Sequence, residues 1–125
     1  GWLQKAQSDA TAARLCIEAQ EAYDVACFHA QQAAEKAVKA YLTAFGIDFP
    51  YIHNLEKLLE ICRRRDSDFD RILHFGEKLT PYAVELRYDA EFWPDETIAR
   101  EALDDAKSVM DFILLKLPQD MKRSS

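Results

Sequence analysis

The chain has 125 residues, of which 49% are hydrophobic and 30% are charged, and this size and composition suit one folded domain with one core. Its formal net charge of −6 argues against a protein that coats nucleic acid without selectivity. The apolar runs are short and the N-terminal segment is broken by polar residues, so we expect no membrane association and a cytoplasmic location.

Two long helices are predicted in the first part of the chain. From residue 2 to about residue 20, apolar side chains recur every three or four positions, which is the spacing of an amphipathic helix. From about residue 22 to residue 45, alanines line the inner face of a second helix and allow a close approach of neighbouring helices. Gly46 is suited to the left-handed conformation that follows a helix end. We expect this second helix to be the central one.

A short connection that contains Pro50 leads to a third helix with an apolar face of Leu55, Leu58, Leu59 and Cys62. Three arginines at positions 63–65 close this helix, where the helix dipole favours cations. A basic cluster of this kind can bind nucleic acid, but beside three nearby aspartates we interpret it as a solvated helix end.

The second half of the chain predicts two further helical regions. Ser67 is expected to cap the first of them, and Gly76 is expected to interrupt it before a second piece from about residue 77 to residue 87. Residues 88–94 are predicted to form a loop. A last helix is expected from about residue 95 to residue 117, where Pro118 stops it and leaves 119–125 as a frayed tail.

Helical periodicity in every long segment, without a competing strand pattern, predicts an all-α fold. Because the connections are short, we expect a four- to five-helix up-and-down antiparallel bundle that forms a single domain over residues 1–125. The three cysteines and three histidines lack the spacing of metal ligands, so we predict buried structural thiols, no metal site and no cofactor.

A polar stripe on the second helix is the first candidate site. His29, Gln32 and Lys36 recur at three and four residues, so they share one side of this helix. The stripe is either a solvated face or a surface that meets a partner subunit or a ligand. His53 stands where the third helix begins, and its ring lies near free backbone N–H groups that can help hold an anion; a purely structural histidine is the alternative.

Arg87 and Tyr88 form the second candidate site, shortly before the aromatic residues Phe92 and Trp93. A guanidinium can make bidentate contact with phosphate, and aromatic rings can stack on bases. The alternative is that Arg87 pairs with one of the many carboxylates of the chain.

These residues together resemble a known family. The pattern begins at Phe28 and reads Phe-x-x-Gln-Gln-Ala-x-Glu-Lys; with the later His53-Asn54-Leu55 and Arg87-Tyr88, it resembles the HEPN domain, named for higher eukaryotes and prokaryotes nucleotide-binding. The similarity spans nearly the whole chain. It implies a helical bundle, a homodimer and, in a toxin–antitoxin-like context, a small nucleotidyltransferase as partner. It also implies that a nucleotide or RNA contacts the candidate residues Arg87, Tyr88, His53, Lys36 and Gln32.

Some members of that family are ribonucleases that carry an Arg-x(4–6)-His motif at the dimer interface, and this chain departs from the motif. After Arg87, the positions where histidine is required hold Phe92, Trp93 and Pro94, and none of the three histidines has an arginine at the required distance before it. We therefore expect a binding module without catalytic residues. The alternatives are a ribonuclease toxin with a non-standard site, in which His53 and Arg87 converge, and a structural dimer without ligand.

Overall fold

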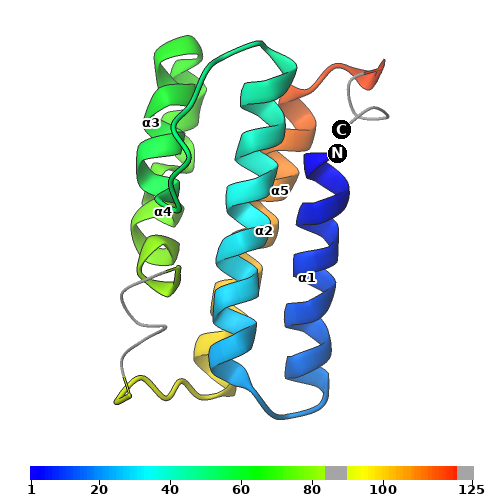
Figure 1. Cartoon of the computed structure of the whole chain (residues 1–125), viewed down its shortest axis with the longest axis vertical. Helices are drawn as coiled ribbons and strands as arrows, with labels where there is room; N and C mark the ends of the chain where they lie inside the picture. The colour runs from blue at the N-terminus through cyan, green and yellow to red at the C-terminus, as the bar shows by residue number, and fades with distance from the viewer. Residues whose placement is uncertain (84–89, 121–125) are drawn as a thin grey trace.

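Helix α2 (Tyr23–Ala44) is the centre of the molecule. In the computed structural model, which describes residues 1–83 and 90–120, α2 packs along α1 (Trp2–Glu18) and α5 (Glu96–Lys116), as Figure 1 shows. Helix α3 (Leu55–Arg65) contacts α2 on another side, and the short α4 (Leu73–Leu79) contacts both α3 and α5. The predicted all-α bundle with a central second helix is confirmed.

Small side chains explain the close packing around α2. Fully buried alanines recur along this helix, and they leave room for the neighbouring helices on two sides; they are Ala26, Ala30, Ala33, Ala34 and Ala37. Larger side chains complete the core at the end of α2, where Tyr41 and Leu42 are fully buried.

Contacts between the helix ends show in which direction each helix runs relative to its neighbours. The Tyr23 hydroxyl at the start of α2 donates to Glu96 at the start of α5, at 3.3 Å, so these two helices run in the same direction. Lys116 at the end of α5 contacts Asp66, which follows α3, at 2.8 Å. The pairs α1–α2 and α3–α4 are antiparallel, and the segment after α2 runs back along α3 before that helix begins (Figure 1).

Helix α2 ends as the sequence predicts. Gly46 has a φ of +65°, its N–H donates to the Thr43 carbonyl at 3.1 Å, and the Ile47 N–H donates to the Leu42 carbonyl at 2.8 Å. This pair of hydrogen bonds is the Schellman motif, which satisfies carbonyls that have no partner within the helix. The glycine supplies the left-handed conformation that the motif requires.

Polar side chains cap two of the other helices at their first turns. The Asn54 side chain accepts from the Lys57 N–H at 3.0 Å, and the Asp95 side chain accepts from the Ile98 N–H at 2.9 Å. These bonds satisfy N–H groups that have no partner within the helix. The predicted start of the last helix at about residue 95 is therefore confirmed.

The first helix is shorter than predicted, because α1 ends at Glu18 rather than near residue 20. The connection to α2 uses left-handed backbone at two residues other than glycine, with φ of 58° at Gln20 and 54° at Ala22. Residues with a Cβ rarely adopt this backbone conformation, and nothing in the local sequence signals it.

The region after α3 differs from the prediction at its cap. The side chain that accepts from a backbone N–H belongs to Asp66, not Ser67; it bonds the Asp68 N–H at 2.9 Å and opens a 3₁₀ turn, η1 (Ser67–Arg71). Aspartate and serine are both good caps, so residue preference alone does not separate two neighbours.

Gly76 does not interrupt the helix, contrary to the prediction. It lies buried inside α4 (Leu73–Leu79), which passes directly over α3. A Cβ at this position would lie 2.9 Å from the Leu59 side chain and 3.1 Å from the Glu56 Cα. The glycine is thus required by the closeness of the two helices and not by a turn. Of the predicted second piece, the structure describes the end of α4, the 3₁₀ turn η2 (Thr80–Tyr82) and Ala83; the remainder lies outside the described residues.

We expect Gly76→Ala to lower the free energy of unfolding by about 1 to 2 kcal/mol, measured by urea denaturation. Overpacking of a buried contact costs about 1 to 3 kcal/mol, whereas alanine in place of glycine inside a helix gains only about 0.5 to 1 kcal/mol. If the variant were more stable than the natural chain, the close contact with α3 would not be the reason for this glycine.

Two of the three cysteines are fully buried and the third is partly exposed. Burial raises the pKa of the thiols of Cys27 and Cys62 to about 12, with a smaller contribution from Asp24 at Cys27. At neutral pH these two thiols are therefore protonated and pack as small apolar groups. Cys16 is intermediate in exposure. Among the described residues, no helix is both long enough and apolar enough to cross a membrane.

Candidate functional site

A row of polar side chains is buried along α2, next to its alanines. Gln31, Gln32, Glu35 and Lys39 are all at most 7% exposed. Burial of a polar or charged group is costly unless hydrogen bonds replace those to water. The partners of these groups therefore determine what the row can do.

The Glu35 carboxylate is the centre of this row. Its side chain is 1% exposed and has three partners. The Gln31 amide donates at 3.2 Å, the Lys39 ammonium donates at 3.2 Å, and Nδ1 of His53 lies 3.1 Å from the second carboxylate oxygen. The buried carboxylate is thus paired with one cation within its own helix and contacted by an imidazole from the segment before α3.

The other members of the row extend this network. The Gln32 amide nitrogen donates to the Gln31 side-chain oxygen at 2.6 Å. The Lys39 ammonium also lies 5.4 Å from the centre of the Trp2 ring, within the range of a cation–π contact. Gln32, a predicted ligand contact, is therefore part of a buried network and is itself 7% exposed.

A second carboxylate, on α1, organises the other side of the predicted polar stripe. Asp9 is 8% exposed, and its two oxygens contact Nδ1 of His29 at 2.7 Å and the Lys36 ammonium at 2.5 Å. The stripe of His29, Gln32 and Lys36 is thus not a plain solvated face, because two of its members are tied to α1 and the third is buried.

The two histidines share one arrangement. Each places Nδ1 on a buried carboxylate, which leaves Nε2 directed away from that carboxylate, and the side chains of His29 and His53 are 30% and 62% exposed. A carboxylate on one ring nitrogen fixes the orientation of the ring and so determines where the other nitrogen points. The arrangement can therefore present a fixed acceptor or donor at the surface, with His53 the more accessible of the two.

The backbone near His53 offers fewer free donors than the sequence suggested. The Glu56 N–H donates to the Thr80 hydroxyl at 3.2 Å, and the Lys57 N–H donates to the Asn54 side chain. An anion at this end of α3 would therefore depend more on the imidazole than on these two N–H groups.

The remaining candidates have different surroundings. Arg87 and Tyr88 lie outside the described residues, so the structure does not test their predicted role. Phe92 is half-buried and packs against Tyr82 with ring centres 5.7 Å apart, whereas Trp93 is 83% exposed. In the basic cluster, the Arg65 guanidinium donates to the Tyr41 hydroxyl at 3.0 Å.

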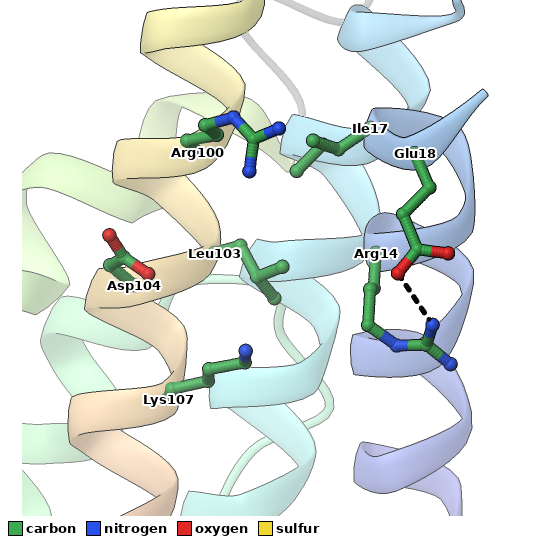
Figure 2. A pocket seen from close by; sticks show the side chains of 7 residues that line it. All are labelled: Arg14, Ile17, Glu18, Arg100, Leu103, Asp104 and Lys107. Carbon is green, nitrogen blue, oxygen red and sulfur yellow. Dashed lines mark hydrogen bonds and ion pairs between the residues drawn. The ribbon is translucent and has the colours of Figure 1, made fainter. Parts of the chain in front are cut away.

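A separate groove of about 260 Å³ lies between α1 and α5, and Figure 2 shows the side chains around it. Ile17 and Leu103 are its apolar residues, and the charged ones are Arg14, Glu18, Arg100, Asp104 and Lys107. None of these residues was among the candidates predicted from the sequence. In the described part of the chain, no group of three or more histidine, cysteine or acidic side chains is placed to hold a metal ion.

Sequence reasoning also missed Asp9, Glu35 and Lys39. A signal for them was present: Gln31, Glu35 and Lys39 repeat at four residues along a helix that is rich in alanine, and Asp9 lies beside Ala6, Ala10 and Ala13 on the apolar stripe of α1. An acidic residue on an apolar stripe requires a partner, and this requirement would have pointed to the cations of the second helix.

The chain is similar to proteins of known fold over nearly its full length. The family model described as the HEPN domain matches residues 1–117. An archaeal HEPN homologue, ST0689, is 27% identical with a TM-score of 0.74, and the match covers 92% of this chain and 93% of that one. The protein TT1696 from Thermus thermophilus is 28% identical with a TM-score of 0.76, and the match covers 93% of this chain and 95% of that one. Among curated proteins, none matches this chain.

Proposed function

This chain belongs to the HEPN domain family, and on that basis we propose that it is a binding module that acts as a homodimer, holds a nucleotide and partners a small nucleotidyltransferase. The observation that supports a ligand site most directly is the His53 ring. It is largely exposed, yet its Nδ1 is held by the buried Glu35 carboxylate. A surface imidazole with a fixed orientation is suited to contact a ligand or a partner, because little conformational entropy is lost when it binds.

The charge of the chain favours a small ligand or a protein partner over a long nucleic acid. With a formal net charge of −6, the molecule as a whole repels a polyanion, whereas one nucleotide needs only a few local contacts. Arg87 and Tyr88 remain the residues that we propose to clamp the phosphate and stack on the base.

The nucleotide part of this proposal is tested by calorimetric titration with AMP and ATP. We expect His53→Ala and Arg87→Ala each to weaken binding by about tenfold, the effect of losing one charge-assisted hydrogen bond. His74→Ala is the matched control, since His74 is exposed and lies on α4, where its ring contacts Phe75. Equal loss in the control, or no binding of either nucleotide, contradicts the proposed site. Cleavage of RNA by the purified protein would instead favour the ribonuclease alternative.

The dimer is tested by light scattering at tens of micromolar. The exposed Trp93 ring supports association, because large apolar side chains at a surface often mark an interface. A monomeric mass would overturn this part of the proposal. For the protein partner, co-purification with a nucleotidyltransferase from the source cells is the direct measurement.

A further inference from the structure

We propose that the groove between α1 and α5 binds the phosphate group of a small organic phosphate monoester, through the cations Arg14, Arg100 and Lys107. The site is separate from the buried row on α2 and from His53. The inference therefore goes beyond the proposed function and does not depend on it.

The three cations reach the groove from two different helices. Arg14 comes from α1, and Arg100 and Lys107 lie seven residues, or about two turns, apart on α5. In Figure 2 the side chains of Arg100 and Lys107 extend from α5 toward α1. Between them lie the side chains of Ile17 and Leu103, which are 2% and 6% exposed as residues. The groove thus combines an apolar floor with a cationic rim.

The donors of these cations are only partly used within the chain. One terminal nitrogen of Arg14 donates to Glu18 at 2.8 Å, and the Nε of Arg100 donates to Glu96 at 3.0 Å. A guanidinium has five N–H donors, so each arginine keeps others for a ligand. Among the residues that the structure describes, the Lys107 ammonium has no ion pair or side-chain hydrogen bond.

Both arginines of the groove are paired with a carboxylate, whereas Lys107 has no such partner among the described residues. Three cations and two carboxylates line the groove; Glu18 is paired with Arg14, and Arg100 is paired with Glu96, which lies one turn away on α5. The Asp104 side chain remains on the α5 side of the groove in Figure 2, away from Arg14. What the groove offers an anion is therefore the Lys107 ammonium together with the guanidinium N–H groups that Glu18 and Glu96 leave unused.

The volume and the lining together indicate the class of ligand. About 260 Å³ is slightly below the range of about 300 to 1,000 Å³ that is usual for drug-sized ligands, so the groove fits a small molecule. A phosphate monoester supplies a dianion for the guanidinium forks and the ammonium, and its organic part covers Ile17 and Leu103. A nucleic-acid strand would need a longer cationic track than this groove offers.

The test uses AMP as the probe, with adenosine and inorganic phosphate as matched ligands that each lack one part. Binding is measured by calorimetry at low salt, and its position by the chemical-shift changes of backbone amides. We expect AMP to bind with shifts near Lys107, adenosine to show no measurable binding, and inorganic phosphate to bind more weakly than AMP. Lys107→Ala is expected to weaken the AMP binding that produces shifts near Lys107 by about tenfold, and to leave binding that produces shifts near His53 unchanged.

Lys57→Ala is the matched control, because Lys57 is also an exposed lysine on a helix but lies on α3. We expect this variant to bind AMP as the natural chain does. Arg100→Gln is a second groove variant that removes the charge and leaves a shorter polar side chain. Thermal melts of all variants confirm that each is folded under the conditions of the titration.

Several outcomes overturn the inference. These are unchanged affinity in both groove variants, equal binding of adenosine and AMP, no binding of AMP by the natural chain, and equal weakening by Lys57→Ala. Shifts confined to residues near His53, with a normal affinity in the groove variants, would overturn the groove site while they support the nucleotide site of the proposed function. Binding in the groove together with unchanged affinity in His53→Ala would support the groove alone.

Discussion

Replacement of Glu35 with alanine is expected to lower the free energy of unfolding by about 3 kcal/mol, because it leaves the Lys39 ammonium buried without its counter-ion. The side chains of Glu35 and Lys39 are only 1% and 7% exposed, so water cannot replace the lost partner at either position. The variant also leaves the Gln31 amide and Nδ1 of His53 without their acceptor. Urea denaturation followed by circular dichroism measures the change.

The chain contains a matched control for this prediction. Arg14 and Glu18 form an ion pair with the same four-residue spacing, but their side chains are 48% and 58% exposed. Glu18→Ala is therefore expected to change the free energy of unfolding by less than about 0.5 kcal/mol. If the two substitutions had equal effects, burial would not be what makes the Glu35 network important. A Glu35→Ala, Lys39→Met double variant is expected to regain part of the loss, since it removes both charges.

Phe69→Ala is expected to have an effect of similar or larger size, about 3 to 5 kcal/mol. Phe69 is fully buried in η1, and its ring packs against the rings of Tyr41 and Phe112, with centres 4.8 Å and 5.0 Å away. The cavity would open where α2, η1 and α5 meet, so the surrounding helices can close it only in part. Since a domain of this kind is stable by only about 5 to 15 kcal/mol in total, the variant is expected to unfold at a much lower urea concentration.

Two further variants separate the cavity from the loss of an aromatic ring. Phe69→Leu retains most of the volume and is expected to cost less than the alanine variant. Tyr51→Ala removes a ring that is 99% exposed and is expected to leave the stability within about 0.5 kcal/mol of the natural chain. A Phe69→Ala variant with near-natural stability would contradict the role of this three-ring contact.

The long helices could be predicted from the sequence because their signals are local. The alanine face of α2, the glycine at its end and the aspartate before α5 all act within a few residues, and the structure agrees with each. The left-handed backbone at Ala22 could not be predicted because the local sequence carries no signal for it. The cap at Asp66 could not be predicted because the neighbouring Ser67 has a similar preference. Gly76 was misread for a different reason: its role depends on Leu59 and Glu56 of another helix, and this proximity has no local signature.

The candidate site shows the same division between local and distant signals. A polar stripe on the second helix could be seen in the sequence, but its partners could not. His29 and Lys36 lie 20 and 27 residues away from Asp9, and His53 lies 18 residues away from Glu35. The groove between α1 and α5 was not foreseen, since its cations come from opposite ends of the chain and each one alone reads as an ordinary surface residue.

The ionic contacts of Asp9 also set the axial register of the first two helices. Alanine faces are smooth, so α1 and α2 would bury a similar surface area between them if one helix slid along the other by one turn, about 5.4 Å. Asp9 contacts both His29 and Lys36, which lie seven residues apart, and only one sliding position allows both contacts. A buried charge of this kind adds little net stability, yet it raises the energy of the shifted arrangements relative to the native one. The polar residues of α2 thereby specify a single alignment that the alanines alone leave open.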